Sequence, residues 1–391
     1  MKILFTSQEF PPETSWGGIG SYVATLTRAL VQQGAEVHVL SAVTGQARSD
    51  TELDGVQIHR TPVERIRGVG RLTRMPLACD RVFLARAVAR ELRRLAVAFD
   101  VCESPEWMCE GLLLPPRLPL VVRLHLGARH VFANLGQHGP DPWVATTLED
   151  RLIARADVVV ATPAQLSAIR LGHSRAVRSV CVQLPVPIPD SSRPRVDPNL
   201  ILFVGRFERR KNPETVIRAA QMIRAEMPEA RLVLVGRDTE TPSGGSYRRE
   251  LEQLRDQLGL ARSVSIEDGW LDEAQLRDRL AQAAVVVVPS RWESFGLIAA
   301  EASALGRPVV AADLPSLRAI VEDRATGRLV EPDDARAWAR ALTELLRDRE
   351  YAETLGQAGI EHIGRHFSPD RIAAQMLAVY ETAIWRRGRR R

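Results

Sequence analysis

Cysteine is scarce in this sequence, and long apolar runs are missing from it. The chain of 391 residues has four cysteines and no CxxC pair, so we expect small buried thiols and neither a disulfide framework nor a zinc site. No window approaches the ~18 uncharged apolar residues that span a membrane. The opening residues, MKILFTSQEF, lack the ~7 to 15 apolar residues of a signal peptide. These absences predict a cytoplasmic protein with no bound metal.

Two common nucleotide-binding motifs are also missing. The dinucleotide fingerprint GxGxxG would need a third glycine after Gly18 and Gly20, but Val23 stands there. The P-loop pattern GxxxxGK[ST] occurs nowhere in the sequence. We therefore disfavour dinucleotide oxidoreductases and P-loop enzymes.

The excess of positive charge is confined to one end of the chain. The net charge is +5, and residues 386–391, RRGRRR, contain five arginines, so the remaining chain is formally neutral. This balance predicts no nucleic-acid partner. We expect a solvated, disordered tail, and the alternative is a weak contact of the tail with an acidic membrane surface, at the inner face of the membrane.

Short apolar runs alternate with amphipathic stretches, which is the pattern of α/β proteins with parallel sheets buried on both faces. The length and the 45% of apolar residues suit two cores, because a single core stops growing near ~250 to 300 residues. A proline-rich stretch at 184–198 separates two such series and predicts a linker. The expected strands cover residues 2–7, 36–41, 56–62, 100–104, 118–125, 156–162 and 177–185, then 200–207, 230–238, 264–270, 284–290 and 307–313.

These series predict two Rossmann-like, doubly wound domains. The first covers residues 1–185, the linker 186–198 and the second domain 199–367. A final amphipathic helix at 368–385 is expected to cross back to the first domain, ahead of the basic tail at 386–391.

In open parallel sheets, ligands bind beyond the carboxyl ends of the strands, so the loops after strands are the informative ones. Gly17 and Gly18 open a helix after the first strand, where free amides receive an anion. In GRFERRKNP, Gly205 ends a strand, and Arg206 and Lys211 can converge on one diphosphate.

The stretch WESFGLIAAE, residues 292–301, follows another strand. Ser294 is expected to cap a helix whose first residues, Phe295, Gly296 and Leu297, offer their amides to an anion. Helical geometry would place Glu293 roughly 10 Å from Glu301, about two turns further on. That is too far for one acid/base couple, but it suits hydroxyl groups at the two ends of an extended ligand.

The chain resembles the retaining glycosyltransferases of family 4, the glycosyl transferases group 1, which have the GT-B architecture of two facing Rossmann-like domains. The matching pieces are the PPxxxxGG loop, GRF with a following lysine, PSRWESFGLIAAEASALGRPVVAAD and ATGRLVEPDD, and they span nearly the whole chain in order. The resemblance implies transfer of a sugar from a nucleotide diphosphate sugar, without a metal or another cofactor.

The resemblance also implies roles for particular residues. Glu301 would bind the ribose hydroxyls and Glu293 the transferred sugar. Arg206 and Lys211 would bind the diphosphate, and His125 would lie near C6 of the sugar. The amides of Gly17 and Gly18, and those of residues 295–297, would face the donor.

The acceptor is less determined, and we expect a small molecule or a growing saccharide. Acidic and aromatic residues follow the strands of the first domain, and an amine-bearing acceptor, such as an aminosugar or aminocyclitol, would suit them. These candidates are Glu9, Glu13, Glu103, Glu106, Trp107 and His130.

Three alternative functions stay open. A phosphorylase of similar shape would need a lysine that carries pyridoxal phosphate, and the absorbance of that cofactor near ~400 nm would reveal it. A sugar-nucleotide 2-epimerase shares the architecture and would act on a donor without any acceptor. A non-catalytic nucleotide-sugar-binding protein would keep the fold but not turn over. The sequence specifies neither the base nor the sugar of the donor, because such details lie in individual site residues.

Overall fold

The computed structural model describes residues 1–11, 17–65, 73–125, 127–134, 136–165, 178–189, 195–241 and 244–389. The chain forms two compact units. Unit 1 consists of Met1–Pro185 and Pro369–Arg391, and unit 2 of Val186–Ser368. Within the described ranges, no helix is both long enough and apolar enough to cross a membrane.

Unit 1 is built on an eight-stranded sheet in the order β3-β4-β2-β1-β5-β6-β7-β8. Every neighbouring pair is parallel except β3 and β4. Strand β3, of sequence SDTEL, was not predicted, because its mostly exposed polar side chains carry no apolar pattern. The strands are β1 (Lys2–Thr6), β2 (Glu36–Val43), β3 (Ser49–Leu53), β4 (Val56–Pro62), β5 (Val101–Pro105), β6 (Leu120–Arg123), β7 (Val158–Ala161) and β8 (Ser179–Cys181).

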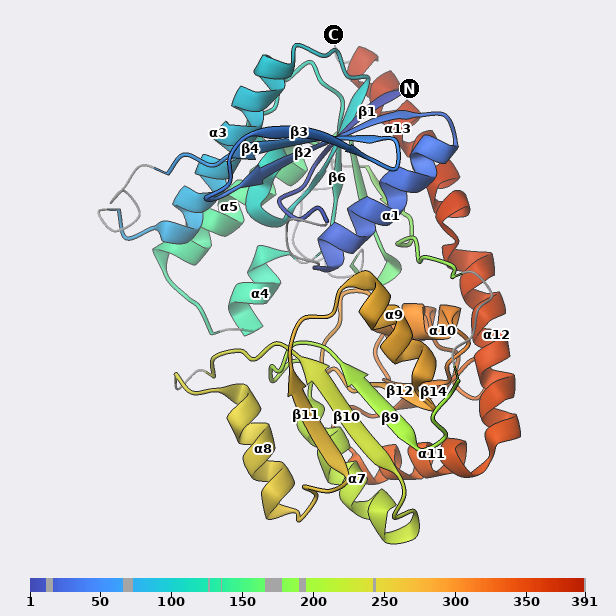
Figure 1. The fold of residues 1–391 in the computed structure, drawn as a ribbon. Helices are drawn as coiled ribbons and strands as arrows, with labels where there is room; N and C mark the ends of the chain where they lie inside the picture. Colours follow the sequence, from blue (N-terminus) through green and yellow to red (C-terminus); the bar gives the residue numbers. More distant parts are fainter. Residues whose placement is uncertain are drawn as a thin grey trace. The chain divides into compact units, whose positions relative to one another are not determined.

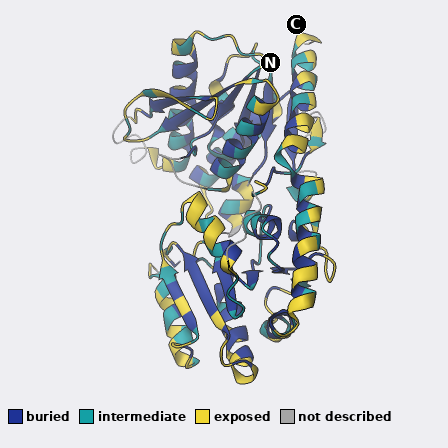
Figure 2. Cartoon of the chain, turned by 45° about the vertical axis from the view of Figure 1, so that its right-hand side comes forward, coloured by how far each residue is buried: buried dark blue, intermediate teal, exposed yellow. Residues whose placement is uncertain are grey.

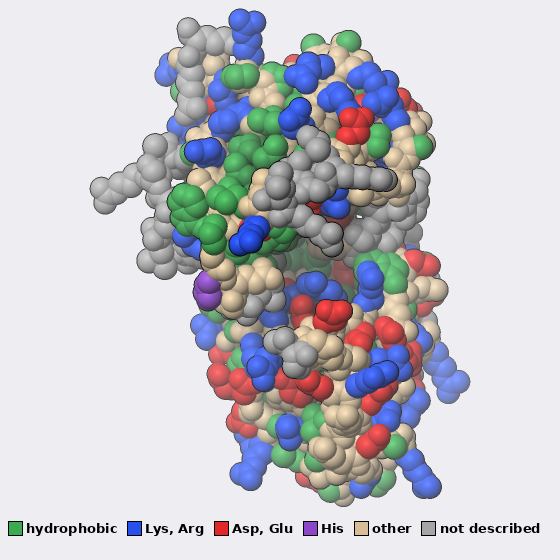
Figure 3. Space-filling model, turned by 90° about the vertical axis from the view of Figure 1, so that its left-hand side faces the viewer, with side chains coloured by type: hydrophobic (Ala, Val, Ile, Leu, Met, Phe, Trp, Pro, Cys, Tyr) green, Lys and Arg blue, Asp and Glu red, His purple; other side chains and the backbone are tan. Residues whose placement is uncertain are grey.

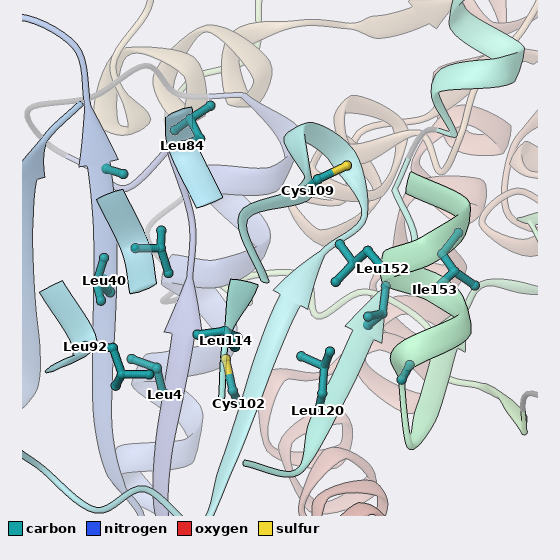
Figure 4. Close-up of a cluster of buried hydrophobic side chains, with 14 of the residues drawn as sticks. Leu4, Leu40, Leu84, Leu92, Cys102, Cys109, Leu114, Leu120, Leu152 and Ile153 are labelled. Carbon is teal, nitrogen blue, oxygen red and sulfur yellow. The ribbon is translucent and has the colours of Figure 1, made fainter. Parts of the chain in front are cut away.

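Helices cover both faces of this sheet. Figure 1 shows α1 and α13 together on one face and α3 and α5 on the other. The core on the α3 and α5 face is a cluster of buried leucines, valines and alanines with Cys102 and Cys109 (Figure 4). The helical segments of unit 1 are α1 (Gly18–Gln32), α3 (Pro76–Leu95), η1 (Trp107–Leu113), α4 (Ala128–Asn134), α5 (Pro140–Arg155) and α13 (Pro369–Arg389).

Unit 2 is built on a six-stranded, wholly parallel sheet in the order β11-β10-β9-β12-β13-β14. The chain order reverses between β9 and β12, and this is the point where ligands bind in such sheets. Strand β14 was not predicted, because only three residues form it. The strands are β9 (Leu200–Val204), β10 (Arg231–Gly236), β11 (Val264–Asp268), β12 (Val285–Val288), β13 (Val309–Ala312) and β14 (Arg328–Val330).

The helices of unit 2 also lie on both faces, and the four inner strands between them, β9, β10, β12 and β13, are almost wholly buried (Figure 2). Together the two sheets confirm the predicted fold class of two doubly wound α/β domains. The helical segments are α7 (Pro213–Glu226), α8 (Tyr247–Gln257), α9 (Glu273–Gln282), α10 (Leu297–Ala304), η2 (Leu317–Ala319), α11 (Ala335–Arg347) and α12 (Arg349–Phe367).

The cysteines are all free, but they are not all buried. Cys102 and Cys109 lie in the core and Cys79 is partly buried. Cys181 is exposed, so the prediction of buried thiols is wrong for this residue. The reason is its place in β8, a three-residue strand at the edge of the sheet.

The basic end of the chain is also different from the prediction of a disordered tail. Helix α13 continues to Arg389, and two of the arginines bind Asp157, which directly precedes β7. Arg386 donates to the carbonyl of Asp157 (2.8 Å), and Arg387 donates twice to its carboxylate (2.7 and 3.0 Å). Because Asp157 is fully buried, these bonds fasten the end of α13 to the start of β7. Two of the five arginines are therefore structural.

We expect Arg387→Ala to destabilise the protein by about 3 kcal/mol, because it leaves the buried carboxylate of Asp157 without its main counter-charge. Chemical denaturation measures this change in the free energy of unfolding. Arg389→Ala is the matched control, since Arg389 is exposed on the same helix and should cost less than about 0.5 kcal/mol. Equal stability of the two variants would contradict the structural role of Arg387.

Candidate active site

The loops that follow β9 and β12 lie side by side, because these two strands are neighbours at the point where the chain order reverses. Lys211, in the loop after β9, donates from Nζ to Oε2 of Glu293, in the loop after β12 (2.5 Å). Both side chains are largely buried, with 18% and 9% of their surface exposed. The structure therefore brings together two of the predicted site residues that are far apart in the sequence.

Glu293 is held by several donors besides Lys211. The hydroxyl of Ser290 donates to Oε2 (3.3 Å), and the backbone N–H of Ser294 donates to Oε1 (3.2 Å). Burial by itself raises the pKa of Glu293, but the charges of Lys211 and Arg210 and the hydrogen bonds from Lys211 and the N–H of Ser294 hold the pKa below its ordinary value. Glu293 is therefore ionised at neutral pH.

Arg210 was not singled out from the sequence, although it belongs to the same RRK run as Lys211. Its guanidinium binds Glu208 (2.6 Å), lies 3.7 Å from the carboxylate of Glu293 and stacks on the ring of Trp292. Arg206, which was predicted, is more exposed, with 59% of its side-chain surface accessible and a 3.4 Å contact to Glu208. Its exposure leaves it able to meet a ligand.

Asn212 is a second residue that the sequence did not reveal. It is fully buried in a left-handed conformation (φ 55°), and its side-chain amide donates to the carbonyls of Pro289 (3.1 Å) and Pro332 (2.8 Å). These carbonyls belong to the loops after β12 and β14. Asn212 thus ties three loops together at the carboxyl edge of the sheet, and no spacing pattern in the sequence signals this.

The start of α10 corrects one prediction. Ser294 does not cap the helix, because the helix begins at Leu297 and Gly296 precedes it in a left-handed conformation (φ 105°). A Cβ atom on Gly296 would lie 2.4 Å from Leu317, so only glycine fits. Glu301 is therefore one helical turn from the start of α10, and helical rise accounts for only about 6 Å of the separation from Glu293 that was predicted as ~10 Å.

The start of α10 presents unpaired polar groups. In the described part of the chain, the backbone N–H groups of Phe295, Gly296 and Leu297 donate to no acceptor. Oε2 of Glu301 is buried and, again among the described residues, has no hydrogen-bond partner. Burial, and to a smaller extent the charge of Glu273, raises the pKa of Glu301 to about 8. These groups can receive an anion at the amides and hydroxyl groups at Glu301.

Glycine also matters where β9 ends. A Cβ atom on Gly236, at the end of β10, would lie 1.8 Å from the carbonyl oxygen of Gly205. The predicted residue Gly205 is thus held close against the neighbouring strand end. The loop that carries Arg206 and Lys211 starts from this fixed point.

His125, predicted from the resemblance, follows β6 in unit 1. It is buried, its backbone N–H donates to Glu106 (2.6 Å), and its ring meets the edge of Tyr22 at 5.1 Å. Burial, helped by the charge of Arg123, lowers the pKa of His125 to about 3. The imidazole is therefore neutral at physiological pH and can serve as a hydrogen-bonding group but not as a cationic acid.

The glycine turn at the start of α1 already contains an anion from the chain itself. Gly17 precedes the helix and Gly18 is its first residue. The carboxylate of Glu9 accepts from the N–H of Gly20 (3.3 Å) and occupies the space that a Cβ atom on Gly17 would need. The predicted residue Glu13 lies outside the described residues.

Glu103 corrects a second prediction, because it is not in a loop. It lies within β5, is 2% exposed, and accepts hydrogen bonds from the hydroxyls of Tyr22 (2.6 Å) and Tyr380 (2.5 Å). Burial raises the pKa of Glu103, although the two tyrosines oppose this shift. This carboxyl joins α1 and α13 to the sheet and has no surface for an acceptor.

The other acceptor candidates differ in their burial. Glu106 is fully buried, and its carboxylate accepts from the backbone of His125. Trp107 is partly buried under the guanidinium of Arg81, and His130 is exposed on α4. Figure 3 shows apolar side chains gathered on unit 1, and interspersed charges of both signs on unit 2. Within the described ranges, no group of three His, Cys, Asp or Glu residues is placed to hold a metal.

Comparisons with known proteins decide the family. The family model described as glycosyl transferases group 1 matches residues 187–362, and the glycosyl transferase 4-like domain matches residues 17–182. The D-inositol 3-phosphate glycosyltransferase of Xylanimonas cellulosilytica is 33% identical over 95% of this chain and 93% of that protein. The chain belongs to the family 4 glycosyltransferases. The predicted family is thus confirmed.

Other relatives and solved structures agree with this assignment. The glycosyltransferase is 31% identical to the D-inositol 3-phosphate glycosyltransferase of Thermobispora bispora, over 95% of this chain and 91% of that protein. Its fold matches sucrose-phosphate synthase from Thermosynechococcus elongatus with a TM-score of 0.76 and 25% identity, over 97% and 98% of the two chains. It also matches Anabaena HepE, solved with UDP and glucose, with a TM-score of 0.72 and 20% identity, over 97% and 99%. These structures show the GT-B fold.

We expect nucleotide binding by this glycosyltransferase to strengthen as the pH rises from 7 to 8 and to level off above pH 8. Hydroxyl groups donate best to an ionised carboxylate, so binding below the raised pKa of Glu301 must release a proton, and the affinity can change by up to about tenfold per pH unit. Calorimetric titration with a nucleoside diphosphate measures this dependence. In Glu301→Gln the affinity should be lower and should not follow this profile, whereas the same profile in both proteins would contradict the assignment.

Proposed function

We propose that this enzyme is a retaining glycosyltransferase that moves a sugar from a nucleotide diphosphate sugar to an acceptor hydroxyl. The observation that carries the proposal is the layout around α10. Among the described residues, a buried carboxyl oxygen on Glu301 without a hydrogen-bond partner stands at one end, three backbone amides without an acceptor lie at the helix start, and ionised Glu293 lies before it. Ribose diol, diphosphate and sugar hydroxyls have the same order of chemical groups.

The proposed reaction needs no covalent enzyme intermediate. The acceptor oxygen forms a bond to the anomeric carbon on the face from which the diphosphate leaves, and the bond between that carbon and the leaving oxygen breaks. The acceptor proton passes to an oxygen of the leaving diphosphate. Lys211, Arg206 and the amides of α10 would stabilise the negative charge that builds there, and such donors typically contribute ~10² to 10³-fold each.

Glu293 has two tasks in this proposal. Its carboxylate orients Nζ of Lys211 through their buried ion pair, and its remaining lone pairs accept from hydroxyls of the transferred sugar. Neutral His125 would add a hydrogen bond to the sugar. We propose that neither a metal nor another cofactor takes part, so turnover should survive a chelator.

For the acceptor, we propose a small polyhydroxylated molecule, and a cyclitol phosphate is the first to test. The names of the relatives, D-inositol 3-phosphate glycosyltransferases, support this choice. An amine-bearing acceptor is less well supported, because the carboxylates of Glu103 and Glu106 accept hydrogen bonds from tyrosine hydroxyls and a backbone N–H inside unit 1. A growing saccharide stays an alternative.

The two glutamates should have separable effects. Glu301→Ala should weaken binding of the free nucleoside diphosphate at least tenfold, since the ribose loses its partner, whereas Glu293→Ala should spare nucleotide affinity and reduce sugar transfer. Titration with UDP, GDP, ADP and dTDP, followed by a product assay with the matching sugar nucleotides and D-inositol 3-phosphate, measures both effects. Glu229→Ala, an exposed residue of unit 2, is the control.

Three results would count against the proposal. If none of the four nucleotides binds, the chain is not a nucleotide-sugar enzyme. If a donor is consumed at the same rate with and without any acceptor and yields an altered sugar, the epimerase alternative is favoured. If both glutamate variants affect nucleotide affinity equally, the direction of the ligand along α10 is wrong.

Lys211→Ala and Arg206→Ala should lower kcat about 10² to 10³-fold and change donor affinity less, because leaving-group charge is largest in the transition state. Steady-state kinetics at saturating donor measures this. Arg218→Ala, an exposed arginine on α7, should keep the wild-type kcat. Wild-type turnover in either site variant would contradict its role at the diphosphate.

A further inference from the structure

The donor turn, defined here as residues 293–297, is packed against the far end of a different helix. Phe295 of the turn is 4% exposed, and its ring meets the ring of Phe367, the last residue of α12, at 5.9 Å with an interplanar angle of 62°. Phe367 is 1% exposed. This edge-to-face pair is the contact through which the turn reaches α12.

Phe367 also stands where the chain passes between the two units. The chain leaves unit 1 after Pro185 and returns to it after Ser368. The N–H of Val186 donates to the carbonyl of Phe367 (2.9 Å), and Val186 is fully buried. One residue therefore joins both chain passages by its backbone and the donor turn by its side chain.

Helices α10 and α12 are packed closely enough to move as one body. A Cβ atom on Gly356 of α12 would lie 2.2 Å from the carbonyl oxygen of Gly306, two residues after the end of α10. Gly359, almost one turn further along α12, faces Ser303 of α10. Close-packed elements transmit displacements instead of absorbing them. The turn at one end of α10 is thus connected rigidly to Phe367.

We propose that Phe367 is a positioning residue for the donor turn and that it couples nucleotide binding to the two chain passages. It touches no substrate and acts through Phe295. When a nucleotide binds residues 293–297, the packed ring of Phe295 passes the displacement of the turn to Phe367, and the carbonyl of Phe367 then holds the amide of Val186 more firmly. This inference rests on the proposed function of the turn. It places within unit 2 the link between a bound nucleotide and the two segments, at Val186 and Ser368, where the chain passes between the units.

The first test compares nucleotide affinity in Phe367→Leu and Phe295→Leu with the wild type. UDP, GDP, ADP and dTDP are titrated by calorimetry, and the tightest is used throughout. Either variant should bind it at least about fivefold more weakly, which is the lower end of typical coupling between sites. Leu345→Ala is the control, because Leu345 is buried in α11 and its truncation disturbs the core of unit 2 at a different helix.

The second test reads the amide of Val186 directly. Hydrogen exchange of the peptide that contains Val186 should slow when the wild type is saturated with nucleotide. In Phe295→Leu at saturating nucleotide, this slowing should disappear although the ligand is bound. If the aromatic pair only stabilises unit 2, the nucleotide should still slow hydrogen exchange at Val186 in this variant, because the effect of the ligand would not depend on the pair.

The outcomes separate this inference from the proposed function. Wild-type affinity in Phe367→Leu, or unchanged slowing at Val186 in Phe295→Leu, would overturn the coupling. If Glu301→Ala still loses nucleotide affinity in that case, the donor site stands without the coupling. If no nucleotide binds the wild type, both proposals fail together.

Discussion

The left-handed backbone at Gly296 is the constraint on which the proposed donor site of unit 2 depends. The chain turns sharply at Gly296 between β12 and α10, and the helix starts at the next residue, Leu297. Only glycine fits this turn, because Leu317 leaves no room for a Cβ atom at position 296. The turn directs the ring of Phe295 inward, and at the start of the helix it leaves three amides that find no acceptor in the described part of the chain. It also returns Glu293 toward the loop after β9, where Lys211 lies. A residue with a side chain at 296 would disturb all of these at once.

Buried polar groups hold the loops of the site together by hydrogen bonds to one another in place of hydrogen bonds to water. Asn212 satisfies carbonyls from two neighbouring loops, and the ion pair of Lys211 and Glu293 is mostly withdrawn from solvent. Such a pair adds little net stability, but removal of one partner leaves a buried charge that costs about 3 to 5 kcal/mol. Glu301 differs, because its buried oxygen has no partner within the described chain. This contrast distinguishes the groups that build the site from the group left for a ligand.

Unit 1 uses its acidic residues in the opposite way. Glu103 binds two tyrosines from α1 and α13, Glu106 binds the backbone of His125, and Glu9 fills the glycine turn of α1. The sequence predicted that these carboxylates bind an acceptor, but in the structure they accept hydrogen bonds from groups within unit 1. Their partners come from distant parts of the chain, up to the last helix.

Much of the fold could be predicted from the sequence, because buried parallel strands read as continuous apolar runs. Strands β3 and β14 escaped, since an exposed strand and a three-residue strand carry no such run. In the site, the motif loops were predicted from the sequence. The structure then showed that the loops after β9 and β12 lie together, because these two strands are neighbours in the sheet. Asn212 and Arg210 were missed because their roles depend on partners about 80 residues away, such as Pro289 and Trp292.

A crystal structure of the enzyme with its intact nucleotide sugar tests the central claim most directly. The account predicts ribose hydroxyls within about 3 Å of the carboxyl of Glu301, a diphosphate oxygen on the amides of residues 295–297, and a sugar hydroxyl on Glu293. A nucleotide bound away from α10, or one lying with its sugar at Glu301 and its ribose at Glu293, would contradict it.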